Sequence, residues 1–394
     1  MSAHRLFLLL GFTSTLPSRY FFVSCALAYL FLMTGRLKSS VARKQSMFGF
    51  IVVCALFPVA TAMGLYAGEP EARLFLVRGL LSMLVVLFFF LSLNPEDDRA
   101  YFAFLTGVFA GIALNSVAVI SFALSPEAYE ALRIEQFSGF DKSARLLRSP
   151  GLQSGTDTAG YLTVFGAVLY LYLRQYGIRN WMVSRKVFYM LLVTPLFCSR
   201  SSMLLAAAVM PVLLIAWGKR IPRADKVIIA IFGSVVATAG VVLVGVLLFP
   251  DLIGLEQPVE LFGVPVEAVY MVTSGESYVE QYDFAHLVSL LPRGGPELYD
   301  NTIGRLLAST GILGLVGGAI VVTYLVLALA FGARKSDRAF VLVFLAIYLF
   351  ASAKNNYVFY AFFVSMSSVF FCRAATGRRG PATLVPSARP EPQP

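Results

Sequence analysis

The chain has 394 residues, of which 58% belong to the hydrophobic set and only 14% are charged, and its mean hydropathy is +0.76. This charged fraction is about half that of an ordinary soluble domain, which excludes a water-soluble globule. The formal net charge of +10 is distributed between apolar segments, a placement that reports membrane orientation and argues against nucleic-acid binding.

Apolar segments close to the length that crosses a bilayer of about 30 Å recur along the chain. They predict an all-α polytopic membrane protein with about twelve transmembrane helices in a single domain, residues 1–372, and a disordered Pro-rich cytoplasmic tail, residues 373–394. The first span is expected to be retained, because no small-residue cleavage site separates it from the next apolar run. The predicted spans are residues 5–17, 20–35, 47–67, 74–93, 101–124, 158–173, 183–199, 201–217, 227–249, 304–331, 339–353 and 355–372.

Clusters of Lys and Arg between the spans predict the orientation. If the spans alternate, the clusters after the second, sixth, eighth, tenth and last spans share one side, which the positive-inside rule makes cytoplasmic. Only the loop with Glu96, Asp97 and Asp98 departs from this pattern. Two long loops, residues 125–157 and 250–303, then lie on the extracytoplasmic side, and loops of such length are usually functional or disordered.

Neither a metal site nor a disulfide framework is expected. The four cysteines lie far apart without a CxxC pair, and the two histidines, His4 and His286, cannot form a metal cluster. The Cys and His residues therefore predict no metal site, and no cofactor is expected.

Charged residues at membrane depth cost about 3 kcal/mol by insertion scales, so each one indicates a site unless another role accounts for it. Arg200 stands between two apolar runs in LFCSRSSMLL and is expected at the outer mouth of a helical bundle. Its neighbours Ser199, Ser201 and Ser202 supply hydroxyl donors. The alternative is an arginine that snorkels to the membrane interface.

The end of the first outer loop carries Arg145 and Arg148, three residues apart, before a Gly-rich stretch and the sixth span. Arginine forks match phosphate oxygens, and the free amides of a helix N-terminus favour anions, so this segment is a candidate pyrophosphate site. A solvated basic loop that balances nearby acidic residues is the alternative. Asp157, at the start of the span, could serve as the helix cap.

The second outer loop closes with Asp300, and Arg305 follows about one turn inside the tenth span. Either the two form an intrahelical ion pair, or Asp300 is a general base and Arg305 a phosphate ligand. Lys354, between the last two spans, is an interfacial anchor or a further anion ligand. Glycines from Gly311 to Gly318 predict a small-residue face for close helix packing.

Three sequence pieces, RLLRSPGLQSGTDTAGYL, TPLFCSRSS and YDNTIGRLLASTGILG, follow one another along the chain at matching topological positions. As an ordered set they resemble the bacterial O-antigen polymerase and O-antigen ligase superfamily over residues 145–315. The Ser-Arg turn, Arg200, and the Arg-x-x-Gly loop, Arg148 and Gly151, match intact. Asp300 stands where the ligases carry a catalytic His, and Asp157 stands where family members commonly carry Asn.

The resemblance implies a GT-C-like glycosyltransferase of the bacterial inner membrane whose active site faces the periplasm. Its implied substrate is undecaprenyl-pyrophosphate-linked glycan, used without nucleotide or metal, and its implied partners are a chain-length regulator and a flippase. Cleavage of a sugar from a lipid pyrophosphate needs cations that take up charge on the leaving group, and paired arginines supply them. The residues assigned to this role are Arg148, Arg200, Arg305, Arg145 and Lys354.

An acceptor hydroxyl must also lose its proton to a base, for which Asp300 is the first candidate and Asp157 the second. Attack from the face opposite the pyrophosphate would invert the anomeric centre. The favoured function is thus a polymerase of O-antigen or exopolysaccharide repeat units. The alternatives are an O-antigen ligase that transfers glycan from the carrier to another acceptor, and a flippase that moves lipid-linked glycan without chemistry. A peptidoglycan polymerase shares the carrier but lacks supporting motifs.

Overall fold

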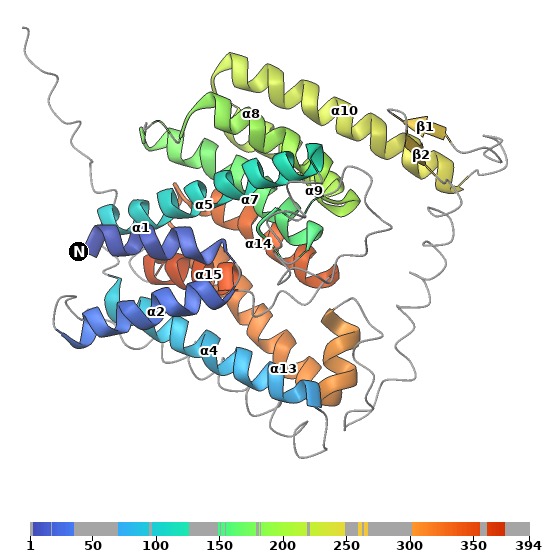
Figure 1. Cartoon of the computed structure of the whole chain (residues 1–394). Helices are drawn as coiled ribbons and strands as arrows, with labels where there is room; N and C mark the ends of the chain where they lie inside the picture. Colours follow the sequence, from blue (N-terminus) through green and yellow to red (C-terminus); the bar gives the residue numbers. More distant parts are fainter. Residues whose placement is uncertain are drawn as a thin grey trace, which may run out of the picture.

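The described part of the chain is a bundle of α-helices with one short β-hairpin, and its core is all-α (Figure 1). The computed structural model describes residues 3–16, 18–34, 70–93, 97–125, 149, 151–153, 155–178, 181, 183–218, 221–248, 259–261, 264–266, 302–354 and 361–374. The hairpin pairs β1 (Val259–Leu261) antiparallel with β2 (Val264–Val266), with Val259 opposite Val266, inside the predicted second outer loop.

The helices follow the predicted spans closely. They are α1 (Ala3–Ser14), α2 (Ser18–Met33), α4 (Pro70–Ser92), α5 (Asp98–Leu124), α7 (Thr156–Gln175), α8 (Arg185–Val193), the 3₁₀ turn η3 (Thr194–Phe197), α9 (Arg200–Trp217), α10 (Arg223–Leu248), α13 (Thr302–Gly332), α14 (Arg338–Lys354) and α15 (Ala361–Ala374). The third predicted span, residues 47–67, lies outside the described residues. Every other span has helical structure at its position, which confirms the helical assignment of the apolar segments.

Two spans are not the continuous helices that the hydropathy predicted. The seventh ends its α-helix at Val193 and continues as η3, because Pro195 has no amide hydrogen for an α-helical bond. The tenth breaks at Gly311, whose φ of 66° and ψ of −168° are open essentially to glycine alone. Gly311 therefore divides α13 into two helical pieces, both visible in Figure 1, instead of contributing to an unbroken packing face.

Within the described residues, two helices are long and apolar enough to cross a membrane, namely Asp98–Leu124 and Leu315–Gly332. Shorter apolar helices are Tyr20–Met33, Leu80–Ser92, Ser201–Ile215, Arg338–Ala353 and Phe362–Ala374.

Helices α1 and α5 pack with their backbones almost in contact. A Cβ atom added to Gly11 would lie 2.0 Å from the carbonyl oxygen of Phe104, and one added to Gly107 would lie 2.0 Å from the carbonyl oxygen of Leu8. Gly107 and Gly111 form a GxxxG pair, the spacing that allows close helix approach in membranes. The first helix is therefore an integral part of the bundle core.

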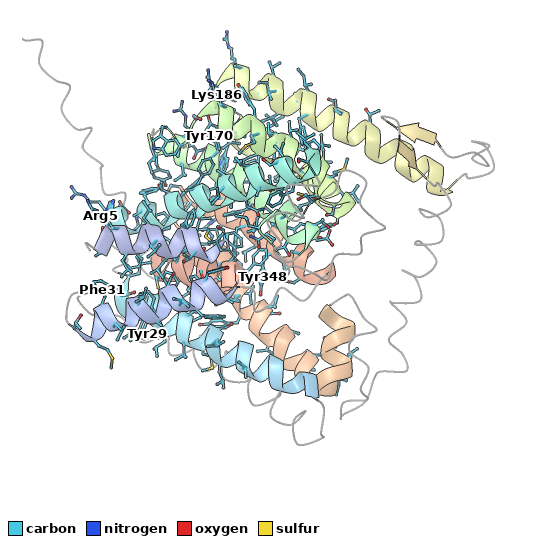
Figure 2. The ribbon with its side chains drawn as sticks, in the orientation of Figure 1. Arg5, Tyr29, Phe31, Tyr170, Lys186 and Tyr348 are labelled. Carbon is cyan, nitrogen blue, oxygen red and sulfur yellow. The ribbon has the colours of Figure 1, made fainter. Side chains whose placement is uncertain are left out.

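Helix α7 occupies the centre of the bundle. All its residues from Thr158 to Leu173 are buried, which is the burial expected of a helix enclosed by other helices on every side. Tyr172 stacks on Phe340 of α14 with ring centroids 4.0 Å apart, and Tyr161 meets Phe350 of the same helix edge-on at 5.9 Å. Side chains from the surrounding helices meet α7 in one continuous core, whereas Arg5 and Lys186 project outward (Figure 2).

Polar contacts gather at both ends of α7. Its first turn meets the start of α9, and its last turn meets the loop between α13 and α14 together with the end of α15. Asp157, a predicted site residue, and Arg373, from a basic cluster predicted to be cytoplasmic, thus lie at opposite ends of the same central helix.

Candidate functional site

The structure describes the predicted site residues to different degrees. Asp157 is described with its side chain, at the first turn of α7. Arg200 begins α9, Arg305 lies in the first piece of α13 and Lys354 ends α14, each described in its backbone position. Asp300, Arg145 and Arg148 lie outside the described residues.

The Asp157 carboxylate is directed at the start of α9. Its Oδ1 accepts a hydrogen bond from the Ser201 hydroxyl at 2.5 Å. Gly155 is the N-cap of α7, and no side-chain cap is made there, so the reading of Asp157 as the helix cap is wrong. As a first-turn carboxylate, Asp157 is favoured by the helix dipole, and its side chain joins two helices.

The serines around Arg200 have separate roles. Ser199 and Ser202 form a capping box: the Ser199 hydroxyl accepts from the Ser202 amide at 3.3 Å, and the Ser202 hydroxyl accepts from the Ser199 amide at 3.2 Å. Ser201 connects this cap to the α7 carboxylate, because its hydroxyl is also 3.0 Å from that of Ser199. Two of the three hydroxyls predicted as ligand donors therefore stabilise the helix start on which Arg200 sits.

The starts of α7 and α9 are close enough to act as one unit. A Cβ atom added to Gly160 would lie 2.2 Å from Cβ of Ser202 and 3.1 Å from Cβ of Cys198. Only glycine leaves room for this approach, so a larger residue would separate Asp157 from Ser201. The N-terminal ends of both helices consequently lie side by side, and the partial positive charges of their dipoles add at this location.

The chain just after Arg148 is bound to three elements of the bundle. The Ser149 amide donates to the Phe197 carbonyl oxygen at 2.8 Å, and the Leu152 amide donates to Oδ1 of Asn115 on α5 at 2.8 Å. Gln153 donates through Nε2 to the carbonyl oxygen of Thr15, the residue that follows α1. Gly151 makes the turn with a φ of 58°.

These contacts bring together two of the three sequence pieces that carried the resemblance. The Gly-rich piece lies on the turn that leads into Arg200, and the hydrogen bond from Ser149 to Phe197 joins them. The end of α14, where Lys354 lies, is on the same end of the bundle, since Phe350 packs against Tyr161 in the first part of α7. Arg305 is beyond the described contacts of this region.

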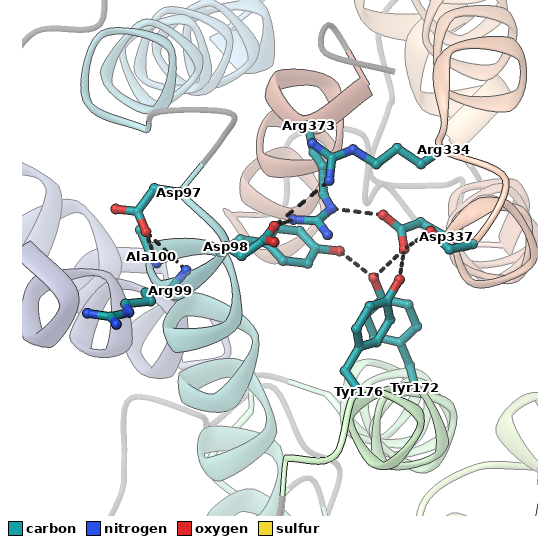
Figure 3. A network of polar contacts seen from close by, with 11 residues as sticks. Asp97, Asp98, Arg99, Ala100, Tyr172, Tyr176, Arg334, Asp337 and Arg373 are labelled. Carbon is teal, nitrogen blue, oxygen red and sulfur yellow. Dashed lines mark hydrogen bonds and ion pairs between the residues drawn. The ribbon is translucent and has the colours of Figure 1, made fainter. Parts of the chain in front are cut away.

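A second polar network lies at the opposite end of α7 and ties four segments together (Figure 3). Arg373 of α15 donates through Nε to Oδ2 of Asp337 at 2.8 Å and through Nη1 to Oδ1 of Asp98 at 2.6 Å. Tyr172 and Tyr176 of α7 donate to Oδ1 of Asp337 at 2.9 and 2.5 Å. Both carboxylates thus share one buried guanidinium, and the loop before α14 is fixed to α7.

This network lowers the pKa of its central carboxyl, that of Asp337. Burial by itself would raise the pKa of Asp337, but the Arg373 guanidinium and the hydrogen bonds from Tyr176 and Tyr172 outweigh it, so the pKa lies below its ordinary 3.8. Asp337 therefore remains charged at neutral pH although it is buried.

The same region explains the acidic loop that departed from the positive-inside pattern. Asp97 is the N-cap of α5, where its Oδ1 accepts from the amides of Arg99 and Ala100 at 3.0 and 3.1 Å. Asp98 is an ion-pair partner of Arg373. Sequence reasoning missed this network, because it treated each charge as a report of orientation. The sequence feature that could have indicated the network is the acidic pair Asp97 and Asp98 at a helix start, on the same side of the bundle as the predicted basic clusters.

Among the described residues no three His, Cys, Asp or Glu side chains gather as a metal site requires. Comparisons of the chain with models of known protein families, with curated proteins and with solved structures gave no match. The resemblance to the O-antigen polymerase and ligase superfamily remains a prediction from the three sequence pieces.

Proposed function

We propose that this chain is a membrane glycosyltransferase that polymerises undecaprenyl-pyrophosphate-linked oligosaccharide repeat units at the outer face of the bacterial inner membrane. The proposal includes twelve transmembrane helices, with the Arg373 network on the cytoplasmic side. The observation that carries it is the attachment of the Gly-rich piece to the turn before Arg200, through the hydrogen bond from Ser149 to Phe197.

This attachment supports a pyrophosphate site because it brings the segment after Arg148 to the turn before Arg200. Arg148 is bonded to Ser149, and consecutive Cα atoms are about 3.8 Å apart. Arg200 is three residues beyond Phe197, at the first position of a helix whose dipole favours anions. The residue after Arg148 is thus hydrogen-bonded to the turn that leads into Arg200, and a diphosphate carries enough oxygens for two guanidinium forks.

The Asp157 carboxylate supports the acid–base part of the proposal. It already accepts a hydrogen bond from a hydroxyl, that of Ser201, at 2.5 Å. An acceptor sugar hydroxyl in the same position would meet an anionic oxygen at the distance that general-base catalysis requires. Asp157 lies between the starts of α7 and α9, so its contacts support it as a base to be tested beside Asp300.

Purified protein in lipid vesicles, given labelled undecaprenyl-pyrophosphate-linked repeat unit, tests the proposal directly. A polymerase yields a ladder of products that differ by one repeat unit and releases undecaprenyl pyrophosphate. Transfer of intact glycan to a different acceptor, without a ladder, would indicate a ligase, and movement of label across the bilayer alone would indicate a flippase. Either of these outcomes overturns the polymerase.

Arg200→Lys is the sharpest variant for this assay. Lysine keeps the charge but has no planar fork, so we expect loss of most turnover with normal membrane insertion. Arg338→Lys, an exposed residue at the opposite end of the bundle, is the matched control and should retain full turnover. Equal turnover in both variants would remove Arg200 from the site.

A further inference from the structure

We propose that Asn115 of α5 is a positioning residue that docks the segment following Arg148, residues 149 and 151–153, against the bundle beside the turn that leads into α9. The inference rests on the proposed function for its ligand, a lipid pyrophosphate. Its structural part, the dock for residues 149–153, stands on contacts that do not depend on any ligand.

The dock is built around one buried amide side chain. Asn115 has no exposed surface, and its Oδ1 accepts the Leu152 amide at 2.8 Å from a residue 37 positions away along the chain. Within the described residues its Nδ2 has no hydrogen-bond partner. A buried polar side chain in an apolar helix is costly, so its acceptor contact to the loop is the interaction that accounts for its presence.

The turn that this amide holds is shaped for close contact. Gly151 has a φ of 58°, and a Cβ atom added to it would lie 2.7 Å from Cγ2 of Val119 and 2.8 Å from Oδ1 of Asn115. Its amide donates to the Ser149 hydroxyl at 3.1 Å. Glycine is thus required twice, for the left-handed backbone and for the space against α5.

The N-terminal helix supplies the second wall of the dock. Gln153, which is 1% exposed, donates to the carbonyl oxygen of Thr15. The Thr15 hydroxyl in turn lies 2.0 Å from where a Cβ of Gly111 would be, so the residue that follows α1 is in close contact with α5 beside this segment. The close packing of α1 on α5 therefore provides a rigid surface that supports the segment after Arg148.

A rigid surface lowers the conformational entropy lost on ligand binding, because arginine side chains have about 2 kcal/mol of rotamer entropy and a loop adds backbone freedom. If residues 149–153 are fixed before the ligand arrives, binding does not have to order them. The loss of the dock should therefore weaken ligand binding without removing any group that contacts the ligand.

Hydrogen–deuterium exchange on the full-length protein in lipid nanodiscs tests the dock without a ligand. Asn115→Leu keeps the branched shape of the side chain but removes the acceptor, and we expect exchange of the Gly151 and Leu152 amides to accelerate about tenfold. Ser116→Ala is the matched control, because Ser116 is equally buried but bonds to Ile112 and Thr163 instead of the loop.

Undecaprenyl pyrophosphate alone is the probe for the positioning role. Its Kd should rise about tenfold in Asn115→Leu, the loss expected when one ordering hydrogen bond disappears, and stay unchanged in Ser116→Ala. If Asn115→Leu does not fold, Gly151→Ala replaces it with the same expected result. The comparison with Ser116→Ala separates positioning from general destabilisation, because a loss of stability alone does not change the Kd of the folded fraction.

Each result decides one part of the inference. Unchanged exchange in Asn115→Leu overturns the dock. Faster exchange with an unchanged Kd overturns the positioning role. Failure of the unmodified protein to bind undecaprenyl pyrophosphate overturns the proposed function and the ligand assigned to the loop, while the exchange data still decide whether the dock exists.

Discussion

Replacement of Arg373 by leucine should strongly destabilise the bundle. The side chain is 6% exposed and holds two carboxylates, at 2.6 Å from Asp98 and 2.8 Å from Asp337, while its guanidinium carbon lies 3.9 Å from the centroid of the Tyr101 ring. Removal of one partner of a buried ion pair typically costs about 3–5 kcal/mol. The Asp98 side chain is 20% exposed and can regain some hydration, so the lower limit, about 3 kcal/mol, applies.

The assay is thermal unfolding in one detergent, with Arg338→Leu as the control for an exposed arginine near the same end of the bundle. A cost of about 3 kcal/mol corresponds to a fall in Tm of roughly 5 °C or more, whereas surface substitutions change stability by about 0.5 kcal/mol or less. Arg373→Lys should fall between the two, since an ammonium group cannot reach both carboxylates with a planar fork. If Arg373→Leu and Arg338→Leu melt at the same temperature, the network does not stabilise the fold.

The same network predicts that the stability of the fold decreases at low pH. The pKa of Asp337 is lower in the folded protein than its ordinary 3.8, so its contribution is complete above pH 3.8 and is lost as the pH falls through the folded value. We expect Tm to decrease below pH 3.8 in the unmodified protein. Arg373→Leu should flatten that decrease, and an equally steep one in the variant would contradict the assigned cause.

Three other substitutions are expected to separate stability from activity. Gly107→Ala should destabilise the packing of α1 on α5, because the added Cβ would lie 2.0 Å from the Leu8 carbonyl oxygen. Limited proteolysis should then release the N-terminal helix, and resistance of that helix to the protease would contradict this packing. Tyr172→Phe removes one hydrogen-bond donor to Asp337 and should lower the free energy of unfolding, measured by urea titration, by about 1 kcal/mol. An unchanged free energy of unfolding would show that this hydrogen bond does not stabilise the fold. Asp157→Asn should reduce glycan polymerisation at least 100-fold while Tm changes little, and normal turnover would exclude it as the base.

Hydropathy was sufficient to predict where the described helices lie, because helix length and apolar composition are local properties. The break at Gly311 was not predictable in the same way, since a glycine in an apolar run is compatible both with close packing and with a non-helical φ of 66°. The GxxxG pair of Gly107 and Gly111 was visible in the sequence. What the sequence did not reveal was its partner, because α1 is about 100 residues away along the chain.

The candidate site shows the same division between local and distant information. The types and order of Arg148, Asp157 and Arg200 were evident from the sequence alone. The contact that joins the segment after Arg148 to the turn before Arg200, from the Ser149 amide to the Phe197 carbonyl oxygen, uses backbone atoms of a kind found in nearly every residue, so no sequence signal marks it. Asn115 was overlooked for a related reason, because a single amide in an apolar helix is informative only when its partner is known.

Helix α7 connects the two polar regions, so the contacts at one end of the helix constrain its orientation at the other end. Its first turn presents Asp157 to α9, and its last turn presents Tyr172 and Tyr176 to Asp337. Each residue of a helix is rotated by about 100° from the next, so fixing the last turn also fixes the direction in which Asp157 points about 20 Å away along the axis. The charged network at the last turn of α7 is therefore best understood as an orientation constraint on the Asp157 carboxylate at its first turn. Because α7 is buried along its whole central length, a rotation would have to disrupt the core around it.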